Sequence, residues 1–354
     1  MSSIIVFKNK CIYLCYNIEK GRGIMLTLTK SLFALMIGFI VSTFFGLIVI
    51  PFLKKIKLGQ NINVYVEAHQ SKSGTPTMGG VIFIIPTILT TLFLLFTNKM
   101  EYSMNLMILL FVFISYGIIG FLDDYLSIKR KTNKGLSQTQ KLLLQFVVAL
   151  IFYILYSQFT EADSYLRISL INLNLDLKWF YGIFILFLLV GSSNAVNLTD
   201  GLDGLAGGLS VIAFLAFGLI AWGSWWIEGY QEMGIFCFIL VGSVLGFLVF
   251  NSHPAKVFMG DTGSLTLGAT LATVAILTAH EISLAVIGGV FVIETLSVMI
   301  QISSVVILKR RVFLMTPIHH HFERLGWKEN DIVKLFWIVG LILGLLALIY
   351  GVWL

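Results

Sequence analysis

The chain alternates between long apolar stretches and short polar segments over most of its 354 residues. Ten stretches of about twenty residues hold no Asp, Glu, Lys or Arg, apart from Glu294 in the ninth. Because a helix rises about 1.5 Å per residue, roughly twenty apolar residues cross the hydrocarbon core of a bilayer. The pattern predicts ten helices, at residues 31–53, 77–98, 102–122, 142–160, 179–199, 204–227, 233–252, 262–279, 282–308 and 335–354.

Composition supports a membrane protein. Hydrophobic residues make up 58% of the chain and charged residues 12%, with a mean hydropathy of +0.93. So few charges do not cover a soluble globule of this length. The apolar runs are continuous and do not alternate with a period of two, which disfavours a membrane β-barrel. We therefore expect an all-α polytopic membrane protein with about ten transmembrane helices, and residues 25–354 as one domain.

Basic residues predict the orientation of these helices. The loops at residues 54–76, 123–141, 253–261 and 309–331 hold fifteen Lys and Arg residues, whereas the opposite loops hold only Lys99, Arg167 and Lys178. Loops rich in Lys and Arg stay in the cytoplasm. The basic loops are thus predicted to be cytoplasmic, and both termini to lie outside. The net charge of +6 also suits anionic substrates and an anionic leaflet.

Acidic residues gather on the predicted cytoplasmic side. Asp123 and Asp124 end the third helix, Asp200 and Asp203 lie between the fifth and sixth, and Asp261 precedes the eighth. A charged side chain costs about 2.5–3.5 kcal/mol at a bilayer centre and is usually functional. Mg²⁺ prefers oxygen ligands and is often held by one or two carboxylates and substrate phosphates. We expect one metal and phosphate site on this face, although Asp123 and Asp124 alone would equally suit a solvated pair.

Two glycine-rich segments are candidates for phosphate and nucleotide binding. In the run from Asn197 to Gly208, glycines allow a close approach of backbone to ligand, and a helix N-terminus favours an anion. Helix capping is the alternative explanation of Asp200 and Asp203. However, two carboxylates and an amide within seven positions exceed what capping requires. The run from Asn251 to Ser264 adds an amide, an aromatic face at Phe258 and another carboxylate, as a nucleotide cradle requires.

Other candidates are weaker. His319, His320 and His321 are consecutive, so on an ordered backbone they cannot all reach one ion, and contacts with phosphate are the better interpretation. Lys72 and Lys141 suit phosphate contacts, but the excess of cytoplasmic basic residues also explains them. Glu294 is expected to be a packed, hydrogen-bonded residue.

Five motifs resemble, in the same order, those of the phospho-N-acetylmuramoyl-pentapeptide-transferase family, called MraY, of the polyprenyl-phosphate N-acetylhexosamine-1-phosphate transferase superfamily. The resemblance covers the chain from about Met25 to Leu354. The motifs are Gly74-Thr-Pro-Thr-Met-Gly-Gly80, Phe121-Leu-Asp-Asp-Tyr125, Ser193-Asn-Ala-Val-Asn-Leu-Thr-Asp-Gly-Leu-Asp-Gly-Leu-Ala206, Val257-Phe-Met-Gly-Asp-Thr-Gly-Ser264 and Thr316-Pro-Ile-His-His-His-Phe-Glu323.

The resemblance implies a ten-helix enzyme of the bacterial cytoplasmic membrane, usually a homodimer, that requires Mg²⁺. It implies transfer of phospho-MurNAc-pentapeptide from UDP-MurNAc-pentapeptide to undecaprenyl phosphate, which gives lipid I and UMP in the first membrane step of peptidoglycan synthesis. No nucleic-acid partner is expected.

The resemblance also implies residue roles. Catalysis would fall to Asp123, Asp124, Asp261 and His320, with Mg²⁺ held by Asp261 and Asp124. Substrate binding would involve a larger set: Lys72, Thr77, Lys141, Asn197, Asp200, Gly201, Asp203, Asn251, Phe258, His319 and His321.

Two mechanisms and three rival functions remain open from the sequence. The acceptor phosphate attacks the donor diphosphate directly, or an aspartyl-phosphate forms first on Asp123 or Asp124. A sister transferase using UDP-GlcNAc would share the aspartates, but the segment from Pro317 to Glu323 favours the muramoyl branch. A transporter would place polar residues near the membrane midplane, and a scaffold would not need acids on one side.

Residues 1–24 fit the ten-helix pattern poorly. Their apolar runs are too short to span a membrane, and no small-residue cleavage site marks a signal peptide. We predict that this segment is an extension and that Met25 starts the native protein. Mass analysis of the N-terminal peptide tests this, and a native protein beginning at Met1 would contradict it.

Overall fold

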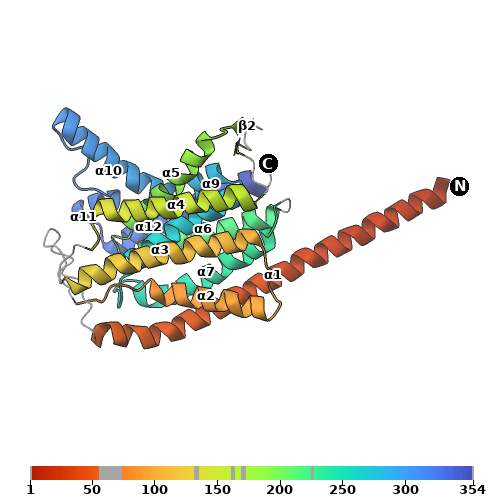
Figure 1. The fold of residues 1–354 in the computed structure, drawn as a ribbon, viewed down its shortest axis with the longest axis horizontal. Helices are drawn as coiled ribbons and strands as arrows, with labels where there is room; N and C mark the ends of the chain where they lie inside the picture. The colour runs from red at the N-terminus through yellow and green to blue at the C-terminus, as the bar shows by residue number, and fades with distance from the viewer. Residues whose placement is uncertain are drawn as a thin grey trace.

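The computed structural model describes residues 2–55, 74–130, 135–160, 164–168, 173–224 and 227–352, with side chains from Thr27 to Ile349. In these residues the chain forms a bundle of helices and one small hairpin, and the start of α1 projects away from the bundle (Figure 1). The helices are α1 (Ser2–Lys55), α2 (Val81–Phe96), α3 (Met104–Lys129), α4 (Gln138–Phe159), α5 (Phe180–Thr199), α6 (Leu205–Gly223), α7 (Tyr230–Asn251), α8 (Gly260–Leu277), α9 (Glu281–Ile287), α10 (Gly289–Leu308), α11 (Ile318–Arg324) and α12 (Glu329–Val352).

The prediction of an all-α polytopic membrane protein is confirmed. Among the described residues, eight helices are long and apolar enough to cross a membrane: residues 27–55 of α1, the helices α3 to α7, α10, and residues 329–349 of α12. The two other predicted spans are also helical. α2 is apolar but has 16 residues, and α8 has 18 residues that are almost all buried in the bundle.

The ninth predicted helix is two helices. α9 ends at Ile287 and α10 begins at Gly289, so the break falls at Gly288 and Gly289. Glycine costs a helix about 0.5–1 kcal/mol relative to alanine, and paired small residues are common places for a kink. After the break, α10 leans out of the bundle (Figure 1). The prediction of one continuous helix over 282–308 was therefore wrong.

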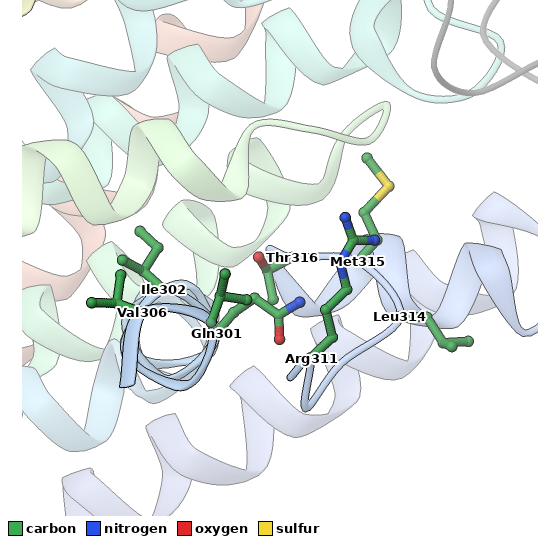
Figure 2. A pocket seen from close by; sticks show the side chains of 8 residues that line it. Gln301, Ile302, Val306, Arg311, Leu314, Met315 and Thr316 are labelled. Atoms are coloured by element: carbon green, nitrogen blue, oxygen red, sulfur yellow. The ribbon is translucent and has the colours of Figure 1, made fainter. Parts of the chain in front are cut away.

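A groove runs along the end of α10. Its lining combines apolar side chains with one basic group, Arg311, where the chain turns back toward α11 (Figure 2). The cavity measures about 390 Å³. The lining residues are Gln301, Ile302, Val305, Val306, Arg311, Leu314, Met315 and Thr316.

The hairpin consists of β1 (Tyr165–Ile168) and β2 (Leu173–Asp176), which pair antiparallel with Tyr165 opposite Asp176. It lies between α4 and α5 in the chain, and β1 packs against α9.

Helix α8 lies at the centre of the fold. It packs against α3 and α5, and its buried positions are mostly Gly, Ala, Thr and Leu. Lipid tails provide no hydrophobic drive for helices to associate, so small residues that allow close packing hold membrane helices together. The hydroxyls of Thr266, Thr270 and Thr273 each donate to the carbonyl one turn earlier, which satisfies them inside the bundle.

Two glycines allow other helices to reach the first turn of α8. A Cβ atom at Gly120 of α3 would lie 2.2 Å from the Asp261 carbonyl oxygen, and one at Gly80 would lie 2.3 Å from the Gly263 nitrogen. Both are backbone contacts, which cannot move aside as a flexible side chain can. The start of α8 is therefore held directly between α3 and the segment that leads into α2.

Gly120→Ala should destabilise the protein, because its methyl group forces α3 away from α8. Overpacking of this kind costs about 1–3 kcal/mol. The control is Gly117→Ala, one turn earlier on α3, where a Cβ meets only ordinary contacts of 3.4 Å or more. We expect thermal unfolding in detergent at a clearly lower temperature for Gly120→Ala only; equal midpoints for both variants would contradict this packing.

Candidate active site

Asp124 caps α8 from a different helix. Its Oδ2 accepts hydrogen bonds from the backbone N–H of Thr262 at 3.0 Å and the Thr262 hydroxyl at 2.6 Å, and its Oδ1 accepts from the Asp261 N–H at 3.3 Å. The first amides of a helix have no partner within the helix, and their positive end favours a carboxylate. Gly260 permits this approach, since a Cβ there would lie 2.4 Å from Asp124 Oδ2.

The prediction that Asp123 and Asp124 end the third helix was wrong. α3 continues to Lys129, so both carboxylates lie within the helix, facing α8 and the start of α4. The helix continues because residues 125–129 still form backbone hydrogen bonds, although Asp123 and Asp124 end the apolar run.

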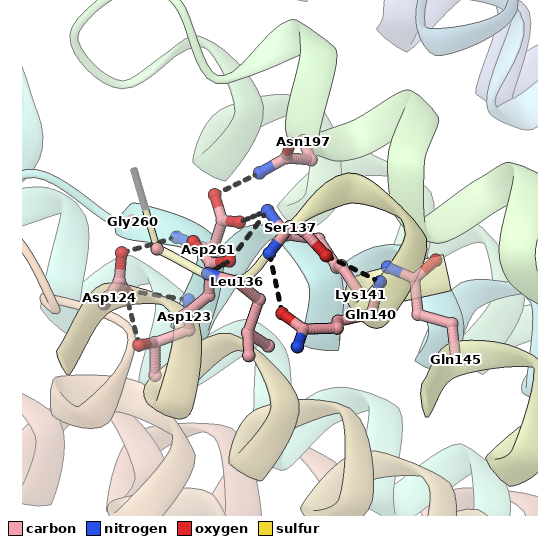
Figure 3. Close-up of polar contacts among 12 residues, drawn as sticks. Asp123, Asp124, Leu136, Ser137, Gln140, Lys141, Gln145, Asn197, Gly260 and Asp261 are labelled. Atoms are coloured by element: carbon pink, nitrogen blue, oxygen red, sulfur yellow. Dashed lines mark hydrogen bonds and ion pairs between the residues drawn. The ribbon is translucent and has the colours of Figure 1, made fainter. Parts of the chain in front are cut away.

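Lys141 joins two of the aspartates. Its ammonium group forms a close ion pair with Asp261 Oδ2 and lies 3.3 Å from Asp123 Oδ1 (Figure 3). On the other side, the Asn197 amide donates to Asp261 Oδ1 at 2.8 Å and to the Ser264 hydroxyl at 2.8 Å. Side chains from α3, α4, α5 and α8 therefore meet at one point.

Local structure places Asp123 and Lys141 precisely enough for this contact. Asp123 Oδ1 accepts the Leu136 N–H at 3.0 Å, which ties the segment before α4 to α3. α4 then begins with a capping box, in which Ser137 and Gln140 bond each other's backbone N–H groups. Lys141 follows in the first turn of α4 and points toward the carboxylates.

Asp203 lies in a second polar network beside the first. Its Oδ2 accepts from Ala255 N at 3.0 Å and lies 3.1 Å from His253 Nδ1, while its own N–H donates to Glu329 Oε1 at 2.7 Å. Ligand atoms of Asp203, His253 and Glu329 all lie within 4.8 Å of one another, a spacing that suits a metal ion. Because these atoms already serve one another and the backbone, we interpret the cluster as a hydrogen-bond network that joins the α5–α6 loop to α7 and α12.

Asn251 and Phe258 shape the segment before α8. The buried Asn251 side chain accepts from the Gly204 N–H at 3.1 Å and donates to the Val257 carbonyl at 3.0 Å. The Phe258 backbone bonds both Pro76 and Gly79, and its side chain is half-buried. Asn251 therefore holds the loops together, whereas the Phe258 ring remains partly accessible.

The three histidines face different partners, as their adjacency predicted. His319 is fully buried beside Glu294, His320 Nδ1 lies 2.6 Å from Glu323 Oε2, and His321 Nδ1 accepts from the Leu314 N–H at 3.2 Å. The three imidazoles of α11 therefore lie in three different environments. Among the described residues, no histidine forms a hydrogen bond or ion pair with Asp123, Asp124 or Asp261.

Three residues predicted from the sequence remain to be located: Thr77, Gly201 and Lys72. Thr77 is buried next to Gly260, where a Cβ would lie 2.7 Å from its hydroxyl oxygen, and that oxygen has no hydrogen-bond partner among the described residues. Gly201 packs against His319. Lys72 lies outside the described residues.

Sequence reasoning missed three residues that organise this region: His253, Thr262 and Glu329. Their signals were present but weak, because a histidine before a proline, a threonine after an aspartate and an acid at a helix start are all common. Only contacts between segments far apart in the chain distinguish them.

Negatively charged groups outnumber positively charged groups at this site. Among the described residues, the carboxylates of Asp123, Asp124, Asp200 and Asp261 contact or influence one another, whereas Lys141 is the cation bound directly to two of them. Oxygen donors crowded around too little positive charge suit a hard cation such as Mg²⁺. The carboxylates that could hold such a cation are Asp261, with one oxygen on Lys141 and one on Asn197, and Asp124, whose oxygens have spare lone pairs.

Comparisons with known proteins match these motifs. A family model described as glycosyl transferase family 4 matches residues 105–279, and a phospho-N-acetylmuramoyl-pentapeptide-transferase signature matches residues 72–84. The phospho-N-acetylmuramoyl-pentapeptide-transferases of Bacillus licheniformis and Bacillus subtilis are each 50% identical to this chain over 325 residues, which cover 91% of this chain and 98% of theirs. The one of Geobacillus thermodenitrificans is 48% identical over 322 residues.

Asp200→Asn should change how stability depends on pH. Burial, and then the charges of Asp261, Asp124 and Asp203, raise the pKa of the Asp200 carboxyl well above its usual range. Such a carboxyl contributes stability that is complete below its unfolded pKa and is lost as pH rises through its folded pKa. We therefore expect Asp200→Asn to unfold at a higher temperature than the wild type at neutral pH, and at a similar temperature in acid.

The control for this measurement is Asp176→Asn, in the exposed strand β2, which should follow the wild-type pH profile. Thermal unfolding of all three proteins across the acidic to neutral range provides the comparison. If the Asp200→Asn protein loses stability with rising pH as steeply as the wild type, the raised pKa of Asp200 is not the cause of that loss.

Proposed function

The chain belongs to the phospho-N-acetylmuramoyl-pentapeptide-transferase family, and we propose that it transfers phospho-MurNAc-pentapeptide from UDP-MurNAc-pentapeptide to undecaprenyl phosphate, forming lipid I and UMP. The observation that carries this proposal is the 50% identity to enzymes of that name over 91% of the chain. The convergence of the aspartates, Asn197 and Lys141 supports it, because this arrangement suits a diphosphate substrate.

The reaction needs positioning and charge stabilisation. In phosphoryl transfer, negative charge spreads over the oxygens of the transferred group while attacking and leaving oxygens stand in line. Lys141 binds Asp261 and Asp123. We propose that its ammonium group also binds the phosphoryl oxygens of the substrate. Preorganised donors of this kind are worth about 3–4 kcal/mol each when they act on the transition state.

Asp123 and Asp124 would have different tasks. Asp124 accepts three hydrogen bonds from the first turn of α8, so it suits a structural role and metal binding better than nucleophilic attack. Asp123 binds Lys141 and the Leu136 N–H through one oxygen, Oδ1. We propose that its carboxylate keeps the acceptor phosphate deprotonated or orients it; if an aspartyl-phosphate forms instead, the same geometry favours Asp123 as the nucleophile.

Asp261 and Asp124 would hold Mg²⁺. When bound, the ion neutralises charge on the diphosphate and on the leaving UMP. The two carboxylates would supply the oxygen ligands, and Asn197 and the capped start of α8 keep Asp261 in place.

The donor would lie over the α5–α6 loop and the segment before α8. Phe258 offers a partly accessible ring for the uracil base, and Asp200, Gly201 and Asp203 would line the pocket with Asn197 and Asn251. Lys72 and Thr77 are proposed to complete this pocket, with His320 and His321 on its α11 side and His319 behind Gly201. His320 is proposed as a catalytic contact with phosphate.

The groove at the end of α10 suits the lipid acceptor. Its apolar lining fits part of the hydrocarbon chain of the acceptor, whose phosphate would lie at Asp123. The Leu314 N–H on the groove wall donates to His321, which links the groove to α11.

The location of the enzyme is part of the proposal. The basic loops predict a cytoplasmic active face in the bacterial cytoplasmic membrane, with both termini outside. A homodimer is expected from the family. Residues 25–354 are proposed as the single transferase domain and residues 1–24 as an extension.

The direct test measures UMP release by purified protein with undecaprenyl phosphate and Mg²⁺, using UDP-MurNAc-pentapeptide or UDP-GlcNAc as donor. The proposal predicts release with the muramoyl donor only, and loss of release on addition of EDTA. Release with UDP-GlcNAc only would move the protein to the sister branch of the superfamily. Release with neither donor, from protein shown to be folded, would overturn the proposal.

Asp123→Asn, Asp124→Asn and Asp261→Asn should each lower transfer by about a hundredfold or more, because each removes a charge that acts on the phosphates or the metal. UMP release under saturating substrates checks this, alongside thermal unfolding to confirm the fold. Near wild-type turnover in any variant would remove that residue from the mechanism. Asp176→Asn, in the exposed hairpin, is the control and should retain full activity.

A further inference from the structure

Glu294 and His319 form a buried pair behind the proposed donor site. Glu294 lies in the second turn of α10 and His319 in the first turn of α11, and both side chains are 0% exposed. His319 Nδ1 lies 3.1 Å from Glu294 Oε1. Among the described residues, neither imidazole nitrogen of His319 and neither carboxylate oxygen of Glu294 has a partner with hydrogen-bond geometry, so the approach of Nδ1 to Oε1 is the polar contact of this pair.

The other edge of the imidazole supports the α5–α6 loop. A Cβ atom at Gly201 would lie 2.2 Å from His319 Nε2 and 2.8 Å from Cε1, so the Gly201 backbone rests directly against the ring. Asp200 precedes Gly201 and Asp203 follows two residues later. The ring therefore lies between a buried carboxyl group and the loop that carries two proposed donor-binding aspartates.

Two physical effects make this pair sensitive to the loss of either member. A carboxylate beside one imidazole nitrogen sets the orientation of the ring and the nitrogen that carries the proton. A buried polar group without a partner is costly, so the ring would turn or shift if the carboxyl group were removed. A shift of about 1 Å at a site that positions substrate can cost about a hundredfold in rate.

The pair is distinct from the rest of α11. His320 is held by Glu323 and His321 by the Leu314 backbone, both local contacts of α11 and the segment before it. Of the three histidines, His319 is the one that is buried against Glu294 of α10 and Gly201 of the α5–α6 loop. Because it is fully buried behind Gly201, it does not offer a surface to substrate in this arrangement.

We propose that Glu294 is a positioning residue that acts through His319 to hold the Asp200–Asp203 loop in the shape that binds the nucleotide part of the donor. This inference rests on the proposed transferase function. It assigns a task to a carboxyl group that the proposed mechanism leaves unused, and it places the task on donor affinity rather than on the acceptor lipid.

The test compares Glu294→Gln and Glu294→Ala with the wild type, with KM for each substrate measured separately. Gln keeps the volume and one oxygen acceptor for His319, whereas Ala removes both. We expect KM for UDP-MurNAc-pentapeptide to rise about tenfold or more in Glu294→Ala and less in Glu294→Gln. KM for undecaprenyl phosphate should stay within about twofold in Glu294→Gln.

The matched control is Glu281→Gln. Glu281, at the start of α9, is also a buried carboxyl group, but it accepts a hydrogen bond from the Tyr181 hydroxyl of α5 and, among the described residues, forms no hydrogen bond or ion pair with the α5–α6 loop. If removing any buried acid merely loosens the bundle, both Gln variants lose thermal stability and change both KM values together. A selective rise in donor KM in the Glu294 variants alone supports positioning.

A double-mutant comparison tests whether Glu294 acts through His319. In a His319→Asn background, Glu294→Gln should change donor KM little further, because the residue that transmits its effect is absent. If the Glu294 and His319 substitutions instead multiply their separate effects on donor KM, Glu294 does not act through His319 and the proposal is overturned. An unchanged donor KM in Glu294→Ala when the wild type is active would also overturn it. An inactive wild type would instead count against the transferase function itself.

Discussion

Asp124 caps the first turn of α8 from α3, and the positions of the other site residues follow from this contact. Two amides and one hydroxyl of α8 converge on its carboxylate, and the glycines at positions 120 and 260 let the two backbones come close enough. In a bundle with little water, a helix end without such a partner is costly. The cap therefore holds Asp261 at the start of α8, where Lys141 and Asn197 can reach it.

The site combines negative charge that the chain does not fully neutralise. Lys141 balances part of the charge of Asp123 and Asp261, while burial and the neighbouring carboxylates raise the pKa of Asp200. Such an arrangement costs stability, and a divalent cation bound with an anionic substrate, as we propose, would offset that cost. Stability is commonly lower where a site is built for function. The predicted pH behaviour of Asp200 and the proposed binding of Mg²⁺ both follow from the same crowding of carboxylates.

Much of the fold was predictable because its elements are long and strongly apolar. The predicted runs correspond to helices, and the acidic residues near their ends do meet in space. Three details were not predictable. Gly288 and Gly289 break the ninth run, but glycine pairs occur in unbroken membrane helices too. α3 continues past Asp124, since polar residues can extend a helix. The partnership of Asp203 with Glu329 depends on how α12 packs, and nothing near either residue signals it.

The sequence by itself determined the class of the protein, the sites of its helices and the residue types that its chemistry requires, because hydrophobic length and acidic motifs are local properties of the chain. Only the tertiary structure decided which acid caps a helix, which binds the lysine, and which histidine is buried. Asp123 and Asp124 are neighbours in sequence, yet they face different partners because a helix turns by about 100° per residue. His319 and Glu294 are 25 positions apart, and they meet only because α10 and α11 pack around the same loop.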